Sequence, residues 1–365
     1  MSRSIWLLPA CLILTAHLGA ARGEQAAVAA AVPQAATECS VKPKAFNPTA
    51  GGKVAFKFKL TGVPAAKVWL VDPIGRVVGS AGAVGPGDSG FFTAEWDGRG
   101  SDGQVLPNDA YCYLPAPADY SPPPEGLPQL AQAAGERLEC KDITYDAQTG
   151  EIRYLLPQAG RTRLRAGVKD GPVVRTMLDW APQPAGRHAV VWDGKDSRGT
   201  EWARAAALVH IWAFSLPQDC VIIHGGAAPA YPVHEKYFQT PAAPKPDLHA
   251  THARQGCHEP RFSVSFPDVS AGSNAPITPK NGRLAARVLL DPRDHKALVE
   301  NLFEIVFYID GVFFFEDSNA SDPFGCTLDL TRVSKGQHVL SVQVMDFEDH
   351  AASRSFRIAC QEPGR

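Results

Sequence analysis

The residues best suited to bind a metal ion are gathered in one segment that is rich in histidine. His249 and His252 are three residues apart, and Cys257 and His258 follow shortly after them. Imidazole nitrogens and a thiol are ligands that zinc and copper accept, so these residues could supply three or four of them. Cys257-His258 also resembles the end of a haem-attachment motif, although Arg254 stands where that motif has its first cysteine.

The same segment also gives reasons to expect no cofactor. It belongs to a proline-containing stretch that begins at residue 223, and such stretches rarely hold a ligand set in place before the ion binds. It also lacks the paired cysteines of structural zinc motifs. We therefore expect no cofactor, and keep a metal- or haem-binding accessory of an extracytoplasmic redox system as the alternative. Tyr231, Tyr237 and Phe238 in this stretch would instead suit a glycan-binding module of an exported hydrolase.

Motifs of enzyme catalysis are missing from the rest of the sequence. The chain has no Gly-x-Ser-x-Gly elbow, no phosphate-binding loop and no His-Glu-x-x-His motif. Acidic pairs such as Asp291 with Asp294 are ordinary at turns and strand ends. We therefore expect a protein that is not an enzyme.

The N-terminus predicts export. Arg3 precedes an apolar run from Ile5 to Leu18, and a stretch of small residues follows, which is the pattern of a signal peptide. No stretch reaches the roughly 20 apolar residues that a membrane span needs. We expect a signal peptide over residues 1–23, a flexible leader over 24–38, and a protein of the periplasm, cell surface or exterior. The formal net charge of −2 gives no reason to expect a nucleic-acid partner.

Cleavage would leave seven of the eight cysteines in a compartment where disulfides persist. One pairing rule gives each expected domain a disulfide between its first and last strands, because these strands of a sandwich can lie side by side. It pairs Cys39 with Cys112, Cys140 with Cys220 and Cys257 with Cys360, and it leaves Cys326 as a free or intermolecular thiol. The rival pairing of Cys326 with Cys360 would free Cys257 beside His258.

Alternating polar and apolar residues predict the strands that position these side chains. Residues 53–60 read Lys-Val-Ala-Phe-Lys-Phe-Lys-Leu, the period of a strand with one buried face. A tryptophan at a tight turn occurs twice, one domain length apart, as Trp96-Asp97-Gly98 and Trp192-Asp193-Gly194. We expect the tryptophan to pack between sheets, the aspartate to open the turn and the glycine to take a positive φ, with no need for calcium. The repeat indicates duplication of a sandwich of about 100 residues.

The first copy resembles the immunoglobulin-like module of the FlgD type. That module opens on Phe-x-Pro, has an Asp-x-x-Gly turn in its middle and closes on Trp-Asp-Gly, here Phe46-Asn47-Pro48, Asp72-Pro73-Ile74-Gly75 and the first Trp-Asp-Gly. The second copy keeps the closing motif. The third unit is similar to a bacterial immunoglobulin-like repeat through Tyr308-Ile309-Asp310-Gly311 and the Gly-x-His pattern at Gly336. The resemblance implies a fold and carries no activity with it.

The sequence therefore predicts an all-β chain of three tandem immunoglobulin-like β-sandwich domains with proline-rich linkers. We expect the domains at 39–118, 138–222 and 257–362, joined by linkers at 119–137 and 223–256.

The function predicted from these observations is that of an exported cell-envelope protein with a structural, adhesive or assembly role. Its partners would be other envelope or extracellular proteins. Phe313, Phe314 and Phe315 are consecutive, and consecutive side chains of a strand point to opposite faces, so at least one should lie at an interface.

Overall fold

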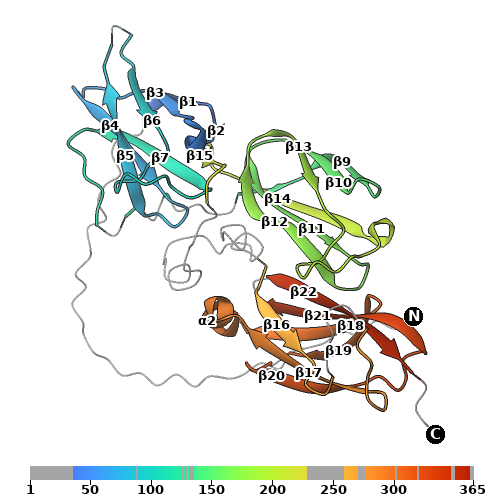
Figure 1. Ribbon diagram of the computed structural model, residues 1–365. Coiled ribbons are helices and arrows are strands. Elements are labelled where there is room, and N and C mark those ends of the chain that lie inside the picture. The colour runs from blue at the N-terminus through green and yellow to red at the C-terminus, as the bar shows by residue number, and fades with distance from the viewer. Residues whose placement is uncertain are drawn as a thin grey trace, which may run out of the picture. The chain divides into compact units, whose positions relative to one another are not determined.

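The computed structural model describes residues 36–361 except 88, 125, 128–129, 131–134, 228–258, 270–275, 301, 319 and 347–349. Regular structure in these residues is dominated by β-strands, as Figure 1 shows, and the expectation of an all-β fold is confirmed. The helices described are α2 (Pro292–Glu300) and the short 3-10 turns η1 (Pro48–Ala50) and η3 (Arg204–Ala206). None of the described helices is long and apolar enough to cross a membrane.

The first sandwich is one continuous sheet that folds back on itself. Its strands are β1 (Thr37–Lys42), β2 (Ala45–Phe46), β3 (Val54–Lys59), β4 (Ala66–Val71), β5 (Val77–Val84), β6 (Phe92–Trp96), β7 (Ala110–Pro117) and β15 (Cys220–Ile223). Their order is β1-β3-β6-β5-β4-β7-β15-β2. Strand β5 pairs with β4 along most of its length and with β6 near its end, so it passes from one layer to the other.

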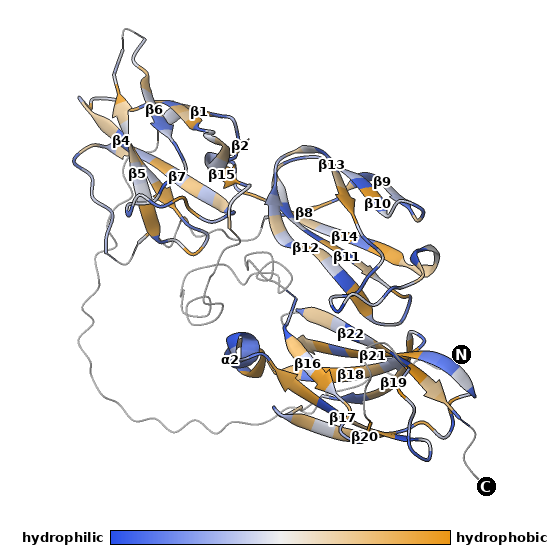
Figure 2. Ribbon diagram, viewed as in Figure 1, coloured by the Kyte–Doolittle hydropathy of each residue, from blue (hydrophilic) through white to orange (hydrophobic). Residues whose placement is uncertain are grey.

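Period-2 alternation places the core of this sandwich between the two layers. On β3, Val54, Phe56 and Phe58 are fully buried while the residues between them are exposed or partly so. The ring of Phe56 meets that of Tyr113 on β7 edge to face, at a centroid distance of 5.1 Å. Figure 2 shows hydrophobic and hydrophilic residues interleaved along the strands, as such alternation requires.

Strand β15 returns to the first sandwich after about a hundred intervening residues. It pairs antiparallel with β7 and parallel with β2, and Figure 1 shows it beside these earlier strands. The sequence predicted that the second domain ends at residue 222. The pairing of β15 with β7 and β2 places residues 220–223 in the first sandwich instead. Because Val221 and Ile223 fill the first core, residues 220–223 complete the first sandwich.

The second sandwich is built from a three-stranded and a four-stranded sheet, in the orders β13-β10-β9 and β12-β11-β14-β8. Its strands are β8 (Arg137–Leu138), β9 (Lys141–Asp146), β10 (Glu151–Leu156), β11 (Gly160–Gly167), β12 (Val173–Gln183), β13 (Gly186–Val191) and β14 (Leu208–Ser215). Trp192 lies in the core with Ile152, Tyr154 and Leu164.

The third sandwich has the sheet orders β16-β17-β20 and β19-β18-β21-β22. Its strands are β16 (Phe262–Ser265), β17 (Arg283–Leu290), β18 (Phe303–Ile309), β19 (Val312–Asp317), β20 (Phe324–Asp329), β21 (Gly336–Asp346) and β22 (Ala351–Cys360). The core draws alternate residues from both sheets, among them Leu284, Ile305 and Val342. Among the described strands, β19 pairs with β18 alone and therefore lies at an edge of its sheet.

Candidate functional site

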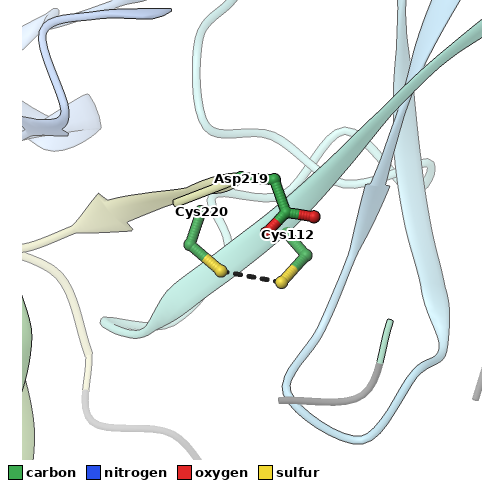
Figure 3. Close-up of side chains that lie close together, drawn as sticks. All are labelled: Cys112, Asp219 and Cys220. Carbon is green, nitrogen blue, oxygen red and sulfur yellow. Dashed lines mark hydrogen bonds between the residues drawn. The ribbon is translucent and has the colours of Figure 1, made fainter. Parts of the chain in front are cut away.

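Two cysteines that are far apart in the sequence face each other in the first sandwich. Cys112 on β7 and Cys220 on β15 are direct cross-strand partners, and their Sγ atoms are 2.7 Å apart. Figure 3 shows both thiols together with the carboxylate of Asp219, and the three groups place one donor atom each within 4.8 Å of one another. This is a cluster that could form a disulfide or hold a metal ion.

The position of the pair follows from the alternation along both strands. Tyr111 and Tyr113 of β7 point into the core between the layers, whereas Cys112 between them points to the other face. Cys220 occupies the same face, which is covered by Leu127 of the linker. The pair is therefore shielded from solvent, with Cys112 1% and Cys220 5% exposed.

Burial affects the protonation of Cys220. It raises the pKa of the Cys220 thiol well above its usual range, and the hydrogen bond to Cys112 and the charge of Asp219 act in the same direction. A metal ligand and a thiol that attacks a disulfide must both be deprotonated, so the raised pKa disfavours both reactions and does not distinguish them. The distinction rests on geometry, because the two Sγ atoms are in direct contact at 2.7 Å.

The structure does not bring together the cysteine pairs expected for the first two domains. Cys39 on β1 hydrogen-bonds to Tyr113, which points away from the face of Cys112. Cys140 is half-buried beside the core of the second sandwich, whereas Cys220 belongs to the first. The rule that each domain is stapled at its own ends fails because the strand carrying Cys220 closes a different domain.

Of the remaining predicted cysteines, Cys360 and Cys326 lie in the third sandwich. Cys360 is buried at the end of β22, and Cys326 is half-buried on β20, where burial raises its pKa to about 11. Cys257 lies outside the described residues, so its pairing with Cys360 stays a prediction. The same holds for His249, His252 and His258 as metal ligands.

The two Trp-Asp-Gly turns have the same local geometry. Trp96 is buried and its indole Nε1 donates to the Arg99 carbonyl at 2.8 Å, while Trp192 donates to the Lys195 carbonyl at 2.9 Å. Each following glycine, Gly98 or Gly194, has a φ of 80°.

The aspartates of these motifs act on their own backbone. Asp97 Oδ1 accepts from the Arg99 amide at 3.2 Å, and Asp193 Oδ1 accepts from the Lys195 amide at 2.9 Å. These bonds are what an aspartate-initiated turn requires. The geometry thus supplies a structural role for the motif.

The three phenylalanines of β19 divide between core and solvent. Phe314 packs against the core of the third sandwich, whereas Phe313 is 53% and Phe315 38% exposed. A register shift of the β18–β19 ladder lies between Phe307 and Tyr308 and leaves Phe314 without a direct partner. Val312 beside them is 68% exposed, so the edge strand exposes three apolar side chains, with Phe313 on the opposite face of the sheet from Val312 and Phe315.

Sequence reasoning missed a stacked cluster in the second sandwich. The Arg163 guanidinium is 4.6 Å from the ring centre of Trp180 and 4.5 Å from that of Trp212. Arg163, Arg165, His210 and Trp212 also line a pocket of about 550 Å³ beside β11 and β14. The alternating arginines of residues 161–165 opposite an aromatic strand were the signal that could have revealed it.

Comparisons with known proteins leave the family of this chain open. No family model and no curated protein matches it. Among solved structures, it is similar to fibronectin(III)-like modules of CbhA from Clostridium thermocellum, with 10% identity over 89% of this chain and 95% of that one and a TM-score of 0.20.

Two adhesion proteins give comparable values. A tetra-tandem repeat from the extending region of a large adhesion protein is 12% identical over 85% of this chain and 70% of that one, with a TM-score of 0.17. A bacterial ice-binding adhesin is 10% identical over 91% and 100%, with a TM-score of 0.20. Similarities this low do not define a function, so the class of all-β sandwich chains rests on the strand pairings themselves.

Proposed function

We propose that this chain is an exported, non-catalytic protein of the bacterial cell envelope, with a structural, adhesive or assembly role that depends on protein–protein contacts. The export step rests on the signal-peptide pattern of residues 1–23. The observation that carries the contact role is the apolar edge strand β19.

Edge strands have backbone groups that another strand can pair with, and proteins usually protect them. Strand β19 instead exposes Val312, Phe313 and Phe315, and no other strand in the described part of the chain pairs with its outer side. Exposed aromatic side chains are typical of protein interfaces. The arrangement suits addition of a strand from a partner protein, in which main-chain bonds give affinity and side-chain pockets give specificity.

Charge beside this edge indicates the chemistry of the partner strand. Glu316 ends the aromatic run on β19, and Glu304 lies close to it on β18. Burial raises the pKa of Glu304, and the negative charge of Glu316 raises it further. Since the two carboxylates repel each other, a basic side chain that faces Glu316 from the outer side of β19 would offset part of this negative charge. We propose that the partner is an extended apolar strand with a lysine or arginine opposite Glu316.

Site-specific photo-cross-linking in the native host tests this proposal. A photoreactive phenylalanine analogue would replace Phe313 in the full chain, and a matched variant would carry it at Val191, which is 66% exposed on the second sandwich. The proposal predicts one cross-linked protein of defined mass from position 313 and none from position 191. A Glu316→Lys change in the same background should reduce that product severalfold.

Two results would contradict the contact role. One is the absence of any product from position 313, and the other is an equal pattern of products from both positions. Fractionation of the same cells tests export separately, because a protein that stays in the cytoplasm would contradict that part of the proposal alone.

A further inference from the structure

Cys112 and Cys220 occupy a position in the ladder that suits a covalent bond. The Tyr113 amide donates to the Asp219 carbonyl at 2.9 Å on one side of the pair. On the other side, the Ile223 amide donates to the Asp109 carbonyl at 2.8 Å. In this antiparallel pattern the two cysteines form a pair that exchanges no backbone hydrogen bonds with each other.

Pairs of this kind bring side chains closest together across two strands. Their Cα atoms are typically about 4.5 Å apart, which lies inside the range of about 4.4–6.8 Å that a disulfide needs. Both thiols also point to one face and are buried under the same linker residue, Leu127. No movement of the strands is needed to join them.

We infer that Cys112 and Cys220 form a disulfide that closes the segment carrying the second sandwich into a loop anchored on the first. In this step each thiol loses its proton and the pair loses two electrons as the S–S bond forms. A small-molecule or enzyme disulfide accepts the two electrons and two protons and is reduced to two thiols. In cells this step rests on the proposed export, because disulfides persist outside the reducing cytoplasm.

The bond would change how the chain carries tension. The two cysteines are 108 positions apart in the sequence. A pull on the ends of the chain would pass from β7 to β15 through the sulfurs and would leave the residues between them unloaded. The second sandwich would then be protected from stretching while the first and third sandwiches remain in the path of the force.

Metal binding is the competing use of the same atoms. Among the residues that the structure describes, the cluster offers two sulfurs and one carboxylate oxygen. A closed structural zinc site needs four protein ligands, so this set is one short. A disulfide needs only the two sulfurs that already face each other.

Oxidative refolding of the full chain without its signal peptide tests the inference independently of export. The unfolded, reduced protein would be refolded with a mixture of reduced and oxidised glutathione, alkylated without reduction and analysed by peptide mapping. We expect the peptide of Cys112 linked to the peptide of Cys220, in the wild type and in the control variant Cys39→Ser. Linkage of Cys39 to Cys112 or of Cys140 to Cys220, or free Cys112 and Cys220 in folded protein, would overturn the inference. Stoichiometric zinc that disappears in Cys220→Ser would also overturn it.

Single-molecule stretching provides a second readout. The oxidised Cys257→Ser variant, in which the predicted bond between Cys257 and Cys360 cannot form, would be pulled by its ends before and after addition of a reducing agent. We expect the reduced chain to extend further by roughly 350 Å, the length of the enclosed residues when stretched. An unchanged total extension would overturn the inference.

Discussion

His338 and Asp310 connect the two short motifs of the third sandwich. His338 Nδ1 and Asp310 Oδ2 are 2.6 Å apart, and Asp310 Oδ1 accepts from the Val339 amide at 2.8 Å. The bond to Asp310 raises the pKa of His338 above its usual value. The histidine therefore links the turn that follows β18, which carries Asp310, to strand β21.

Replacement of His338 by glutamine should make the stability of this sandwich less dependent on pH. A raised folded-state pKa means that the protonated histidine stabilises the fold fully below its unfolded value of about 6.5. That stabilisation is lost as the pH rises through the folded value. We expect the variant to be about 0.5–1 kcal/mol less stable than wild type near pH 5.5, with a smaller difference near pH 8.5. Urea unfolding at both pH values measures this, and a difference that grows with pH would contradict it.

We expect even the conservative replacement of Arg163 by lysine to destabilise the second sandwich. Its planar guanidinium stacks on two indole rings, and a lysine ammonium cannot reproduce that contact. We expect Arg163→Lys to reduce the free energy of unfolding by about 1–2 kcal/mol. The matched change Arg187→Lys, at a side chain 77% exposed, should have no measurable effect. Equal unfolding midpoints for the two variants would disprove a structural role of the stack.

The turn residues were predictable from sequence, whereas the partner of Cys112 was not. Trp96, Asp97 and Gly98 act through bonds within a few residues, so local rules describe them. The pairing of Cys112 with Cys220 depends on a strand that returns after a whole intervening sandwich. Alternation alone indicates that Cys112 is buried, and gives no information on which strand lies beside it.

Strand β15 is the element that most alters the arrangement expected from the sequence. Its four residues are all buried, and they add to the free side of β7. From sequence alone, a run of four apolar residues after a domain can be assigned equally to the last strand of that domain or to an earlier domain. The duplicated Trp-Asp-Gly motif favoured the first assignment, because it implied two complete copies in succession.

Truncation of Ile223 to alanine tests the placement of β15. The side chain is 1% exposed in the core of the first sandwich, so its loss should cost about 2–4 kcal/mol. Hydrogen exchange should then accelerate in β7 and leave β11 of the second sandwich unchanged. Faster exchange confined to β11 would return residues 220–223 to the second sandwich.

At the scale of the whole molecule, the described part of the chain is a series of β-sandwiches. The fold class followed from period-2 alternation and paired turns, which three sandwiches share. The surface that a partner would use depends on which strand lies at an edge, and sequence alternation does not report strand order. The run of phenylalanines predicted an interface. The edge position of β19 adds how a partner could bind there, by pairing a strand with β19.

The alternative function as a metal- or haem-binding accessory makes a separate prediction. Under the account proposed here, the full chain binds no stoichiometric zinc or haem, and replacing His249, His252 and His258 by alanine changes nothing in a titration. Stoichiometric binding of either group that disappears in the triple variant would favour the alternative.

Hydrogen exchange of β19 tests the central claim most directly. It would be compared between the purified chain and the complex isolated gently from the native host. Strand addition predicts slower exchange at the amides of Val312–Asp317 in the complex, because the partner backbone accepts their outward-pointing hydrogens. Identical exchange of this strand in both samples, with any protection gained elsewhere, would contradict the account.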